Sequence, residues 1–292
     1  MELLIIRLAS LVAIAFAYML FDVLNNRNVP TVFAYSSLAY GVALTVLYLN
    51  IRTIVASIGI AVAVLGLGYV VYRIGQLGAG DVIEFAALSL IMPFQGIPVL
   101  YGITQLGIPF IISVFIATGV VALVVVPLYY IPRAKKVLGG SISGLVGRKD
   151  IFKAGFVGAA WVVFAAFLIV FARIGAGGII IVAALIFGSV AAVVYEKPMT
   201  FAMVDFVGVS RFEEGDIIAF NIMDKRQIDS IKKRFGGFDR LVTGHTIKEM
   251  KRRNIRDKVP VYKKAIPLAA PIFIGLVISI LFGNLMLLLL PV

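Results

Sequence analysis

The stretch RIGQLGAGDVIEFAALSL (residues 73–90) places Asp81 directly after a Gly-Ala-Gly turn and before an apolar run. Aspartate is a preferred residue at helix starts, so this pattern predicts that a helix opens near Asp81. A carboxyl group in the apolar part of a membrane helix is costly, and such groups commonly have a partner or a function. The position of Asp81 relative to the membrane therefore decides what this carboxyl group can do.

The composition around this stretch is that of a membrane protein. The chain has 292 residues, of which 61% are hydrophobic and 14% are charged. Soluble domains are nearer to half apolar and a quarter charged. The sequence therefore predicts an all-α polytopic membrane protein.

We expect about eight membrane-spanning helices, and at least about six, because a helix needs roughly 20 apolar residues to cross the hydrocarbon core. The fourth apolar segment is interrupted by Pro93, Gly96 and Pro98. The expected spans are residues 3–21, 32–49, 54–72, 82–92 with its continuation, 108–131, 151–171, 179–195 and 265–290.

This hydropathy pattern divides the chain into a transmembrane body (residues 1–195), a basic module (196–264) and a last transmembrane helix (265–292) that packs with the body. In the module, residues 212–220 predict a turn followed by a strand. Residues 227–235 and 246–253 have helical spacing, so we expect a small α+β unit. Its basic face suits anionic lipid headgroups. It carries no aromatic stacking platform, so nucleic acid is not an expected partner.

The basic residues predict which side of the membrane each loop faces. Lysine and arginine gather in cytoplasmic loops, and here they concentrate in the loops that follow the first, third, fifth and seventh expected spans. The amino terminus is therefore expected outside the cell membrane. The loop after Asp22, the loop before Asp81 and the basic module are expected on the cytoplasmic side.

The chain lacks the residue types that several kinds of chemistry require. It contains no cysteine, which excludes disulfides, thiolate nucleophiles and sulfur-ligated metals. The single histidine, His245, cannot build a histidine-rich metal site and is expected to be a solvated surface residue. The sequence predicts no cofactor and no metal, and it carries no signal for an oligomeric state.

Two carboxyl groups are expected at the same depth of the membrane body. The first span ends at Asp22 and the fourth opens at Asp81, so both are expected at the cytoplasmic end. If they touch, one proton is shared, because two neighbouring carboxylates in a poorly solvated site cannot both ionise. Such a pair activates water and polarises a peptide carbonyl, as in aspartic proteases. The alternatives are a helix cap at Asp81 and a solvated loop residue at Asp22.

The turn and the helix after it add two expectations. Gly78 and Gly80 lack Cβ atoms, so they permit unusual backbone angles and the close approach of an extended substrate strand. Glu84 lies one helical turn from Asp81 and is expected to be a cytoplasm-facing polar residue near the helix start, although its charge could perturb the aspartate.

Three regions resemble the membrane-embedded Gly-x-Gly-Asp aspartic peptidases, in particular the archaeal preflagellin and prepilin peptidases of the prepilin peptidase family. They are DVLNNRNVP (residues 22–30), GAGD (78–81) with Ala86-Ala87, and IPLAAPIFIG (266–275) with Gly283-Asn284-Leu285. The segment EGDIIA (214–219) is also similar. Ile83 stands where many members of the family have lysine, and those archaeal members have six spans.

The resemblance implies that Asp22 and Asp81 are the catalytic pair and that Gly78 and Gly80 support them. It implies a precursor of archaellin or a type IV pilin-like subunit as substrate, whose short basic leader is removed at the cytoplasmic membrane face. Presenilin and signal peptide peptidase relatives also use Gly-x-Gly-Asp, but their aspartates lie on consecutive spans. Two alternatives remain. One is a secondary transporter that uses the carboxylates of Asp22 and Asp81 for proton or ion coupling, and the other is a non-enzymatic membrane scaffold.

Overall fold

The computed structural model describes residues 2–25, 29–48, 50–74, 77–94, 109–140, 142–171, 173–223, 228–229, 241–252, 258–263 and 268–285. Most of the described residues are helical. Each expected apolar segment contains a helix, which confirms a largely α-helical membrane protein. These helices are α1 (Glu2–Leu24), α2 (Thr31–Tyr48), α3 (Ile51–Arg73), α4 (Ala79–Ile91), α5 (Phe110–Val137), α6 (Arg148–Phe171), α7 (Ala176–Val194) and α11 (Ala269–Phe282).

The helices differ in length more than hydropathy predicted. By length and composition, 5 of the described helices can cross a membrane: α1, α3, α5, α6 and α7. Helices α2 and α11 are apolar but shorter. Helix α4 has only 13 residues, and the expected continuation of this span through Gly96 and Pro98 lies outside the described residues. The count of about eight full-length spans is therefore not reached among the described helices.

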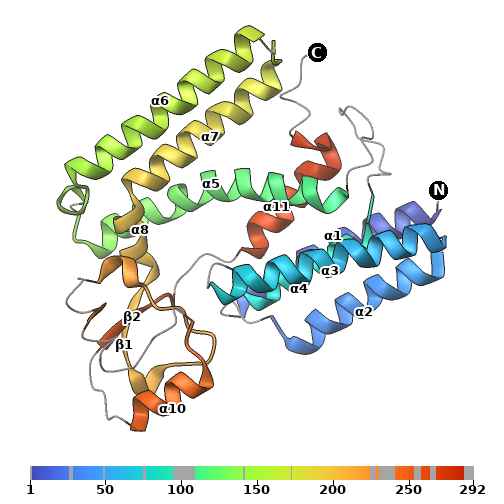
Figure 1. The fold of residues 1–292 in the computed structure, drawn as a ribbon, viewed down its shortest axis with the longest axis horizontal. Helices are drawn as coiled ribbons and strands as arrows, with labels where there is room; N and C mark the ends of the chain where they lie inside the picture. Colours follow the sequence, from blue (N-terminus) through green and yellow to red (C-terminus); the bar gives the residue numbers. More distant parts are fainter. Residues whose placement is uncertain are drawn as a thin grey trace.

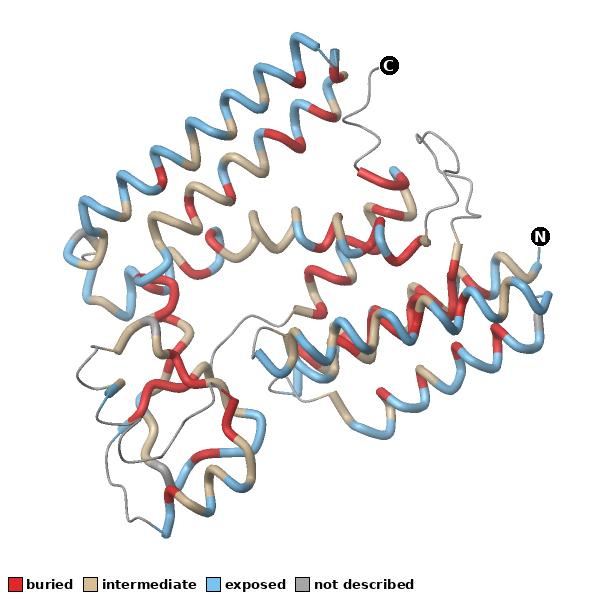
Figure 2. The backbone as a smooth tube through the Cα atoms, in the orientation of Figure 1, coloured by how far each residue is buried: buried red, intermediate tan, exposed pale blue. Residues whose placement is uncertain are grey.

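Helices α1 to α4 form one bundle, and α5 and α11 pack against each other beside it (Figure 1). Helix α11 also contacts α1, and α7 contacts α5 and pairs with α6. Helix α6 is exposed along most of its length, as expected of a lipid-facing helix (Figure 2). The described glycines after α5, Gly139 and Gly140, have φ of 66° and 98°, the left-handed conformation that ends many helices.

Helix α4 lies at the centre of the body. Residues Val82 and Glu84 to Ile91 are all buried, and Phe85, Leu88 and Ile91 belong to the largest apolar cluster of the described residues. Two glycines allow the neighbouring helices to approach closely. A Cβ atom at Gly41 of α2 would lie 2.9 Å from the Cβ of Leu90, and one at Gly68 of α3 would overlap the side chain of Val82.

The carbonyl groups at the end of α4 are bonded by side chains of other helices. The buried Arg7 of α1 donates from Nη1 to the Ile91 carbonyl at 2.7 Å and from Nη2 to the Leu44 carbonyl at 2.8 Å. Thr45 of α2 donates to the Leu90 carbonyl at 2.9 Å. The last carbonyls of a helix have no partner within it, and leaving them unbonded in an apolar body is costly. These bonds therefore fix one end of α4, whose other end carries Asp81.

The chain after α7 forms a small unit at the end of the helical body. Helix α8 (Glu196–Met203) packs on α5. Strand β1 (Asp205–Gly208) pairs antiparallel with β2 (Lys258–Val261), and Val207 lies opposite Val259. The unit also contains η2 (Val209–Arg211), η3 (Phe220–Ile222) and α10 (Gly244–Arg252), and the 3-10 turn η1 (Ser143–Leu145) precedes α6. Its buried apolar cluster comprises Phe212, Ile218, Val242, Met250, Val259 and Val261.

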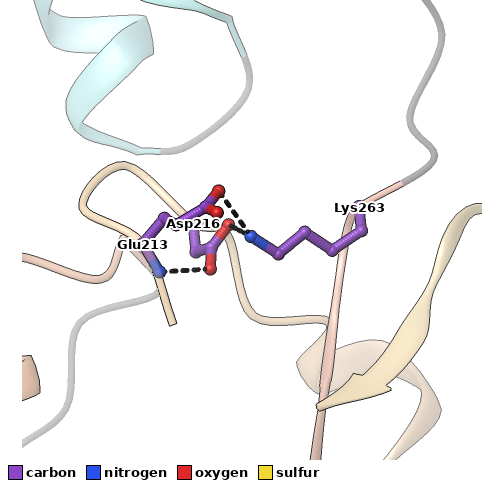
Figure 3. A network of polar contacts seen from close by, with 3 residues as sticks. All are labelled: Glu213, Asp216 and Lys263. Atoms are coloured by element: carbon purple, nitrogen blue, oxygen red, sulfur yellow. Dashed lines mark hydrogen bonds and ion pairs between the residues drawn. The ribbon is translucent and has the colours of Figure 1, made fainter. Parts of the chain in front are cut away.

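A polar network joins Glu213 and Asp216 to Lys263, near the end of this unit (Figure 3). The ammonium group of Lys263 lies 2.9 Å from Glu213 Oε2 and 2.8 Å from Asp216 Oδ1, and Asp216 also accepts the Glu213 N–H at 2.9 Å. Burial lowers the pKa of Lys263, but the hydrogen bonds and charges of Asp216 and Glu213 outweigh burial and raise it above its ordinary value. Lysine 263 is therefore positively charged at neutral pH, and the ion pairs hold the segment that leads to α11.

The expectations for this unit had mixed outcomes. The helix expected at 246–253 is confirmed as α10. The turn at Glu214 and Gly215 is present, but no strand follows it, because Ile217 and Ile218 form only isolated bridges with Leu241 and Val261. The helix expected at 227–235 lies outside the described residues except 228–229. The sequence did not predict β1 and β2, which are too short and too polar at their ends to stand out.

Candidate active site

Asp22 lies in the last turn of α1 with 8% of its surface exposed, so it is not the solvated loop residue of the alternative interpretation. Its Oδ2 atom accepts the N–H of Ala269 at 3.1 Å, across 247 positions of sequence. Ala269 is the first residue of α11, and the first N–H groups of a helix have no partner within it. A carboxylate fits here because it bonds that N–H and meets the positive end of the helix dipole.

Asp81 is the third residue of α4 and is partly exposed. Its Oδ2 atom accepts the N–H of Gly78, the residue that caps the helix, at 3.0 Å. The cap that the sequence offered as an alternative is therefore present. It does not decide the role of Asp81, because the same carboxyl group also interacts with charged groups of another helix.

The two glycines differ from expectation. Gly78 has φ of −76° and ψ of 151°, an extended conformation that any residue adopts, and Gly80 lies within α4. Neither needs the unusual backbone angles that we expected of them. What glycine provides at position 78 is space, because a Cβ atom there would lie 2.9 Å from Asp81 Oδ2. At position 80 the nearest atom, of Val29, would lie at an ordinary 3.6 Å.

The carboxyl groups of Asp22 and Asp81 lie close enough to interact electrostatically, although they come from helices separated by α2 and α3. Helix α1 ends where α4 and α11 begin, so the three helix ends meet at the end of the body that carries the small unit (Figure 1). The sequence expectation that both aspartates lie at one end of the body agrees with this geometry. The catalytic use of the pair stays a prediction.

Tyr18 is a member of this site that the sequence did not single out. It lies one helical turn before Asp22 on α1, is fully buried, and interacts electrostatically with Glu84 and Asp81. Its hydroxyl group lies 2.9 Å from Ser37 Oγ of α2. A hydroxyl-bearing residue four positions before an aspartate, on the same helix face, is the signal that could have identified it.

The expectation for Glu84 is wrong. It is not a solvent-facing residue: it is fully buried within α4, as its neighbours Val82 and Phe85 are buried. Both of its carboxyl oxygens lack a hydrogen-bond partner among the described residues. Glu84 also interacts electrostatically with Asp81 and Asp22. The site therefore contains three carboxyl groups, and the third is the deepest.

An apolar cavity of about 460 Å³ runs along α4 between α3 and α5. Val82 and Phe85, the neighbours of Asp81 and Glu84 on α4, form part of its wall. The other lining residues are Val64, Leu67, Gly68, Val71, Leu77, Ile111, Ile112 and Phe115. The helix that carries Asp81 and Glu84 thus also borders a space suited to an apolar chain.

The side chains that could bind a metal ion are not clustered in the described part of the chain. No group of three or more histidine, cysteine, aspartate and glutamate side chains there is arranged to hold a metal ion. His245 is exposed on α10, as expected.

Comparison with protein-family models finds no matching family, and comparisons with curated proteins and with solved structures find no match either.

Proposed function

We propose that this chain is a membrane aspartic endopeptidase that removes the short basic leader of archaellin or type IV pilin-like precursors. The observation that carries the proposal is the approach of Asp22 and Asp81 at one end of the apolar body. Their approach is not a consequence of sequence proximity, since one ends α1 and the other begins α4. The resemblance of residues 22–30 and 78–81 to the prepilin peptidase family agrees with it.

In the proposed reaction, the ionised aspartate takes a proton from a water molecule while the water oxygen bonds to the scissile carbonyl carbon. The neutral aspartate gives its proton to the carbonyl oxygen, which forms a tetrahedral intermediate. When the carbon–nitrogen bond breaks, the proton taken from water passes to the leaving amine. One hydroxyl group of the tetrahedral intermediate gives its proton to the aspartate that had protonated the carbonyl oxygen. The pair thereby regains its starting protonation state.

The surroundings of the pair suit a substrate that is apolar on one side of the cut and polar on the other. The apolar cavity beside α4 fits the hydrophobic segment that follows the cleavage point. The partly exposed Asp81 fits a cut made near the aqueous boundary. We place this boundary at the cytoplasmic face of the cell membrane, with the amino terminus outside, because the basic loops are expected there.

The small unit that follows α7 is, in this proposal, a cytoplasmic α+β module that leans on the membrane body. Leu241 and Thr243 of the unit and Tyr69, Val70, Arg73 and Ile74 of α3 line a shared cavity of about 320 Å³. The chain has a net charge of +12, which favours anionic lipid headgroups as a further partner.

The test is cleavage of a tagged precursor by membranes that contain the protein. Asp22→Asn and Asp81→Asn should each lower the cleavage rate at least ~100-fold, because each removes a group that transfers a proton. Persistent cleavage by either variant would remove the proposal.

Asp150 provides a matched control for the cap at Asp81. It accepts the N–H of Gly147 at 3.1 Å, the same contact three residues back that Asp81 makes with Gly78. Asp150→Asn should therefore replace a capping carboxylate by an amide, as Asp81→Asn does, and keep cleavage. If Asp81→Asn and Asp150→Asn lose cleavage to the same extent, the role of Asp81 is structural.

A secondary transporter is the second candidate, because three neighbouring carboxyl groups in a helical body also suit proton coupling. In that case liposomes that contain the protein should dissipate a proton gradient in the presence of a transported solute, and the precursor should stay uncut.

A further inference from the structure

Glu84 has a set of properties that the two-aspartate reaction does not explain. It is fully buried in α4, and neither carboxyl oxygen has a hydrogen-bond partner among the described residues. Buried polar atoms are nearly always bonded, so an exception calls for an explanation, of which a catalytic role is one. Glu84 is not remote from the site, since it interacts electrostatically with both aspartates.

The site has two layers of polar groups. Asp22 and Asp81 form the layer at the end of the body. Tyr18 lies one turn deeper on α1, and Glu84 lies one turn deeper on α4. Tyr18 and Glu84 are both fully buried, which places these two side chains in the same deeper layer. The Tyr18 hydroxyl group is already bonded to Ser37.

An ionised carboxylate that is buried without a donor is far more costly than a neutral carboxylic acid in the same place. Among the described residues, the titratable groups that interact with Glu84 are Tyr18 and Asp22 of α1 and Asp81 of its own helix, and none of these three supplies a positive charge. A neutral carboxylic acid also differs from a carboxylate in having an O–H donor.

We propose that Glu84 is a positioning residue of the aspartate pair, an uncharged carboxylic acid whose O–H is donated to the pair when substrate is bound. The role rests on the proposed peptidase function. Its neutral state rests only on the burial of Glu84 and the absence of a bonded partner for it among the described residues. The hydrogen bond would hold the ionised aspartate in one orientation without adding a second negative charge to the site.

Two variants separate the parts of this proposal. Glu84→Gln keeps the size and a hydrogen-bond donor but cannot ionise, and Glu84→Met keeps the size without a donor. Glu84→Gln should cleave at nearly the rate of the unaltered protein, with the acid limb of its pH profile unmoved. Glu84→Met should lower kcat by about 100-fold, the cost of removing one oriented donor, with KM little changed.

Infrared absorption supplies a readout that does not depend on cleavage. In bilayers at neutral pH, the unaltered protein and Asp150→Asn should both show the C=O band of a protonated carboxyl group at Glu84. Glu84→Gln should lack this band. This measurement tests the neutral state even if no precursor is cut, so its failure is distinct from failure of the proposed function.

Three results would overturn the proposal. The first is an infrared spectrum in which Glu84→Gln removes no protonated carboxyl band. The second is an acid limb that moves to lower pH in Glu84→Gln, since removing a neighbouring negative charge eases ionisation of the aspartates. The third is cleavage by Glu84→Met at the unaltered rate. If Glu84→Met does not fold, the first two measurements on Glu84→Gln decide.

Discussion

The carboxyl group of Asp81 takes part in two interactions at once. It accepts the N–H of Gly78 and it interacts with Asp22 on another helix. From the tetrapeptide Gly78–Asp81 alone, a cap and a catalytic role are competing interpretations. The structure makes them compatible, because a cap fixes the orientation of a side chain that a reaction also needs fixed.

The glycines on either side of Ala79 allow this orientation to be tested. Gly78→Ala should displace the Asp81 carboxyl group, since the new Cβ atom would lie 2.9 Å from Oδ2, and the end of this side chain can shift. We expect a cleavage rate about 10-fold lower, because small misplacements of catalytic groups are costly. Thermal stability should change little.

Gly80→Ala is the matched control for this prediction. Its Cβ atom would lie 3.6 Å from Val29, an ordinary contact, and alanine favours a helix. This variant should cleave like the unaltered protein. Equal losses in the two alanine variants would contradict a specific role for the space at position 78.

At the scale of the element, α4 is a short helix enclosed by longer ones. Its 13 residues start at the carboxyl site and end at the carbonyl groups that Arg7 and Thr45 bond. Gly41 and Gly68 let α2 and α3 pack tightly on it. The position of Asp81 therefore depends on contacts that lie several turns away.

Arg7→Met should destabilise this arrangement, because it leaves the carbonyl groups of Ile91 and Leu44 without their donors in an apolar body. We expect a loss of about 1–3 kcal/mol, the cost of unsatisfied buried polar groups. Thermal unfolding of the purified protein in detergent micelles measures it. Arg52→Met is the control, since Arg52 is exposed in the first turn of α3. Equal losses in both variants would contradict a stabilising role for the bonds that Arg7 donates.

Hydropathy predicted the helices well, because twenty or so apolar residues have few other stable conformations in a membrane. It did not predict the short α4, whose length depends on side chains from α1 and α2. The two aspartates were found because charge is rare in apolar segments. Arg7 is also a charge within an apolar segment, but its bonds to the carbonyl groups of Ile91 and Leu44 depend on contacts between distant helices.

The buried position of Glu84 and the bond from Ala269 to Asp22 could not be read from the sequence, since both depend on contacts between distant segments. The short strands β1 and β2 were missed for the same reason, because they are stabilised by each other rather than by local pattern.

At the scale of the whole molecule, the first and last apolar helices meet at the site. Asp22 near the end of α1 accepts the N–H of Ala269 at the start of α11, and β2 and Lys263 directly precede that segment of chain. The small unit is therefore adjacent in sequence to a helix that touches a proposed catalytic residue. Residues of both α1 and α11 therefore contribute to the hydrogen bonding of Asp22.

The central claim is that Asp22 and Asp81 work as a pair that shares one proton. The measurement that tests it most directly is kcat for precursor cleavage as a function of pH, with the purified protein in lipid bilayers and saturating precursor. We expect a rate that rises and then falls with pH, because only the singly protonated pair is active. A rate that rises to a plateau and stays there would contradict the account, because one ionised carboxylate would then be enough.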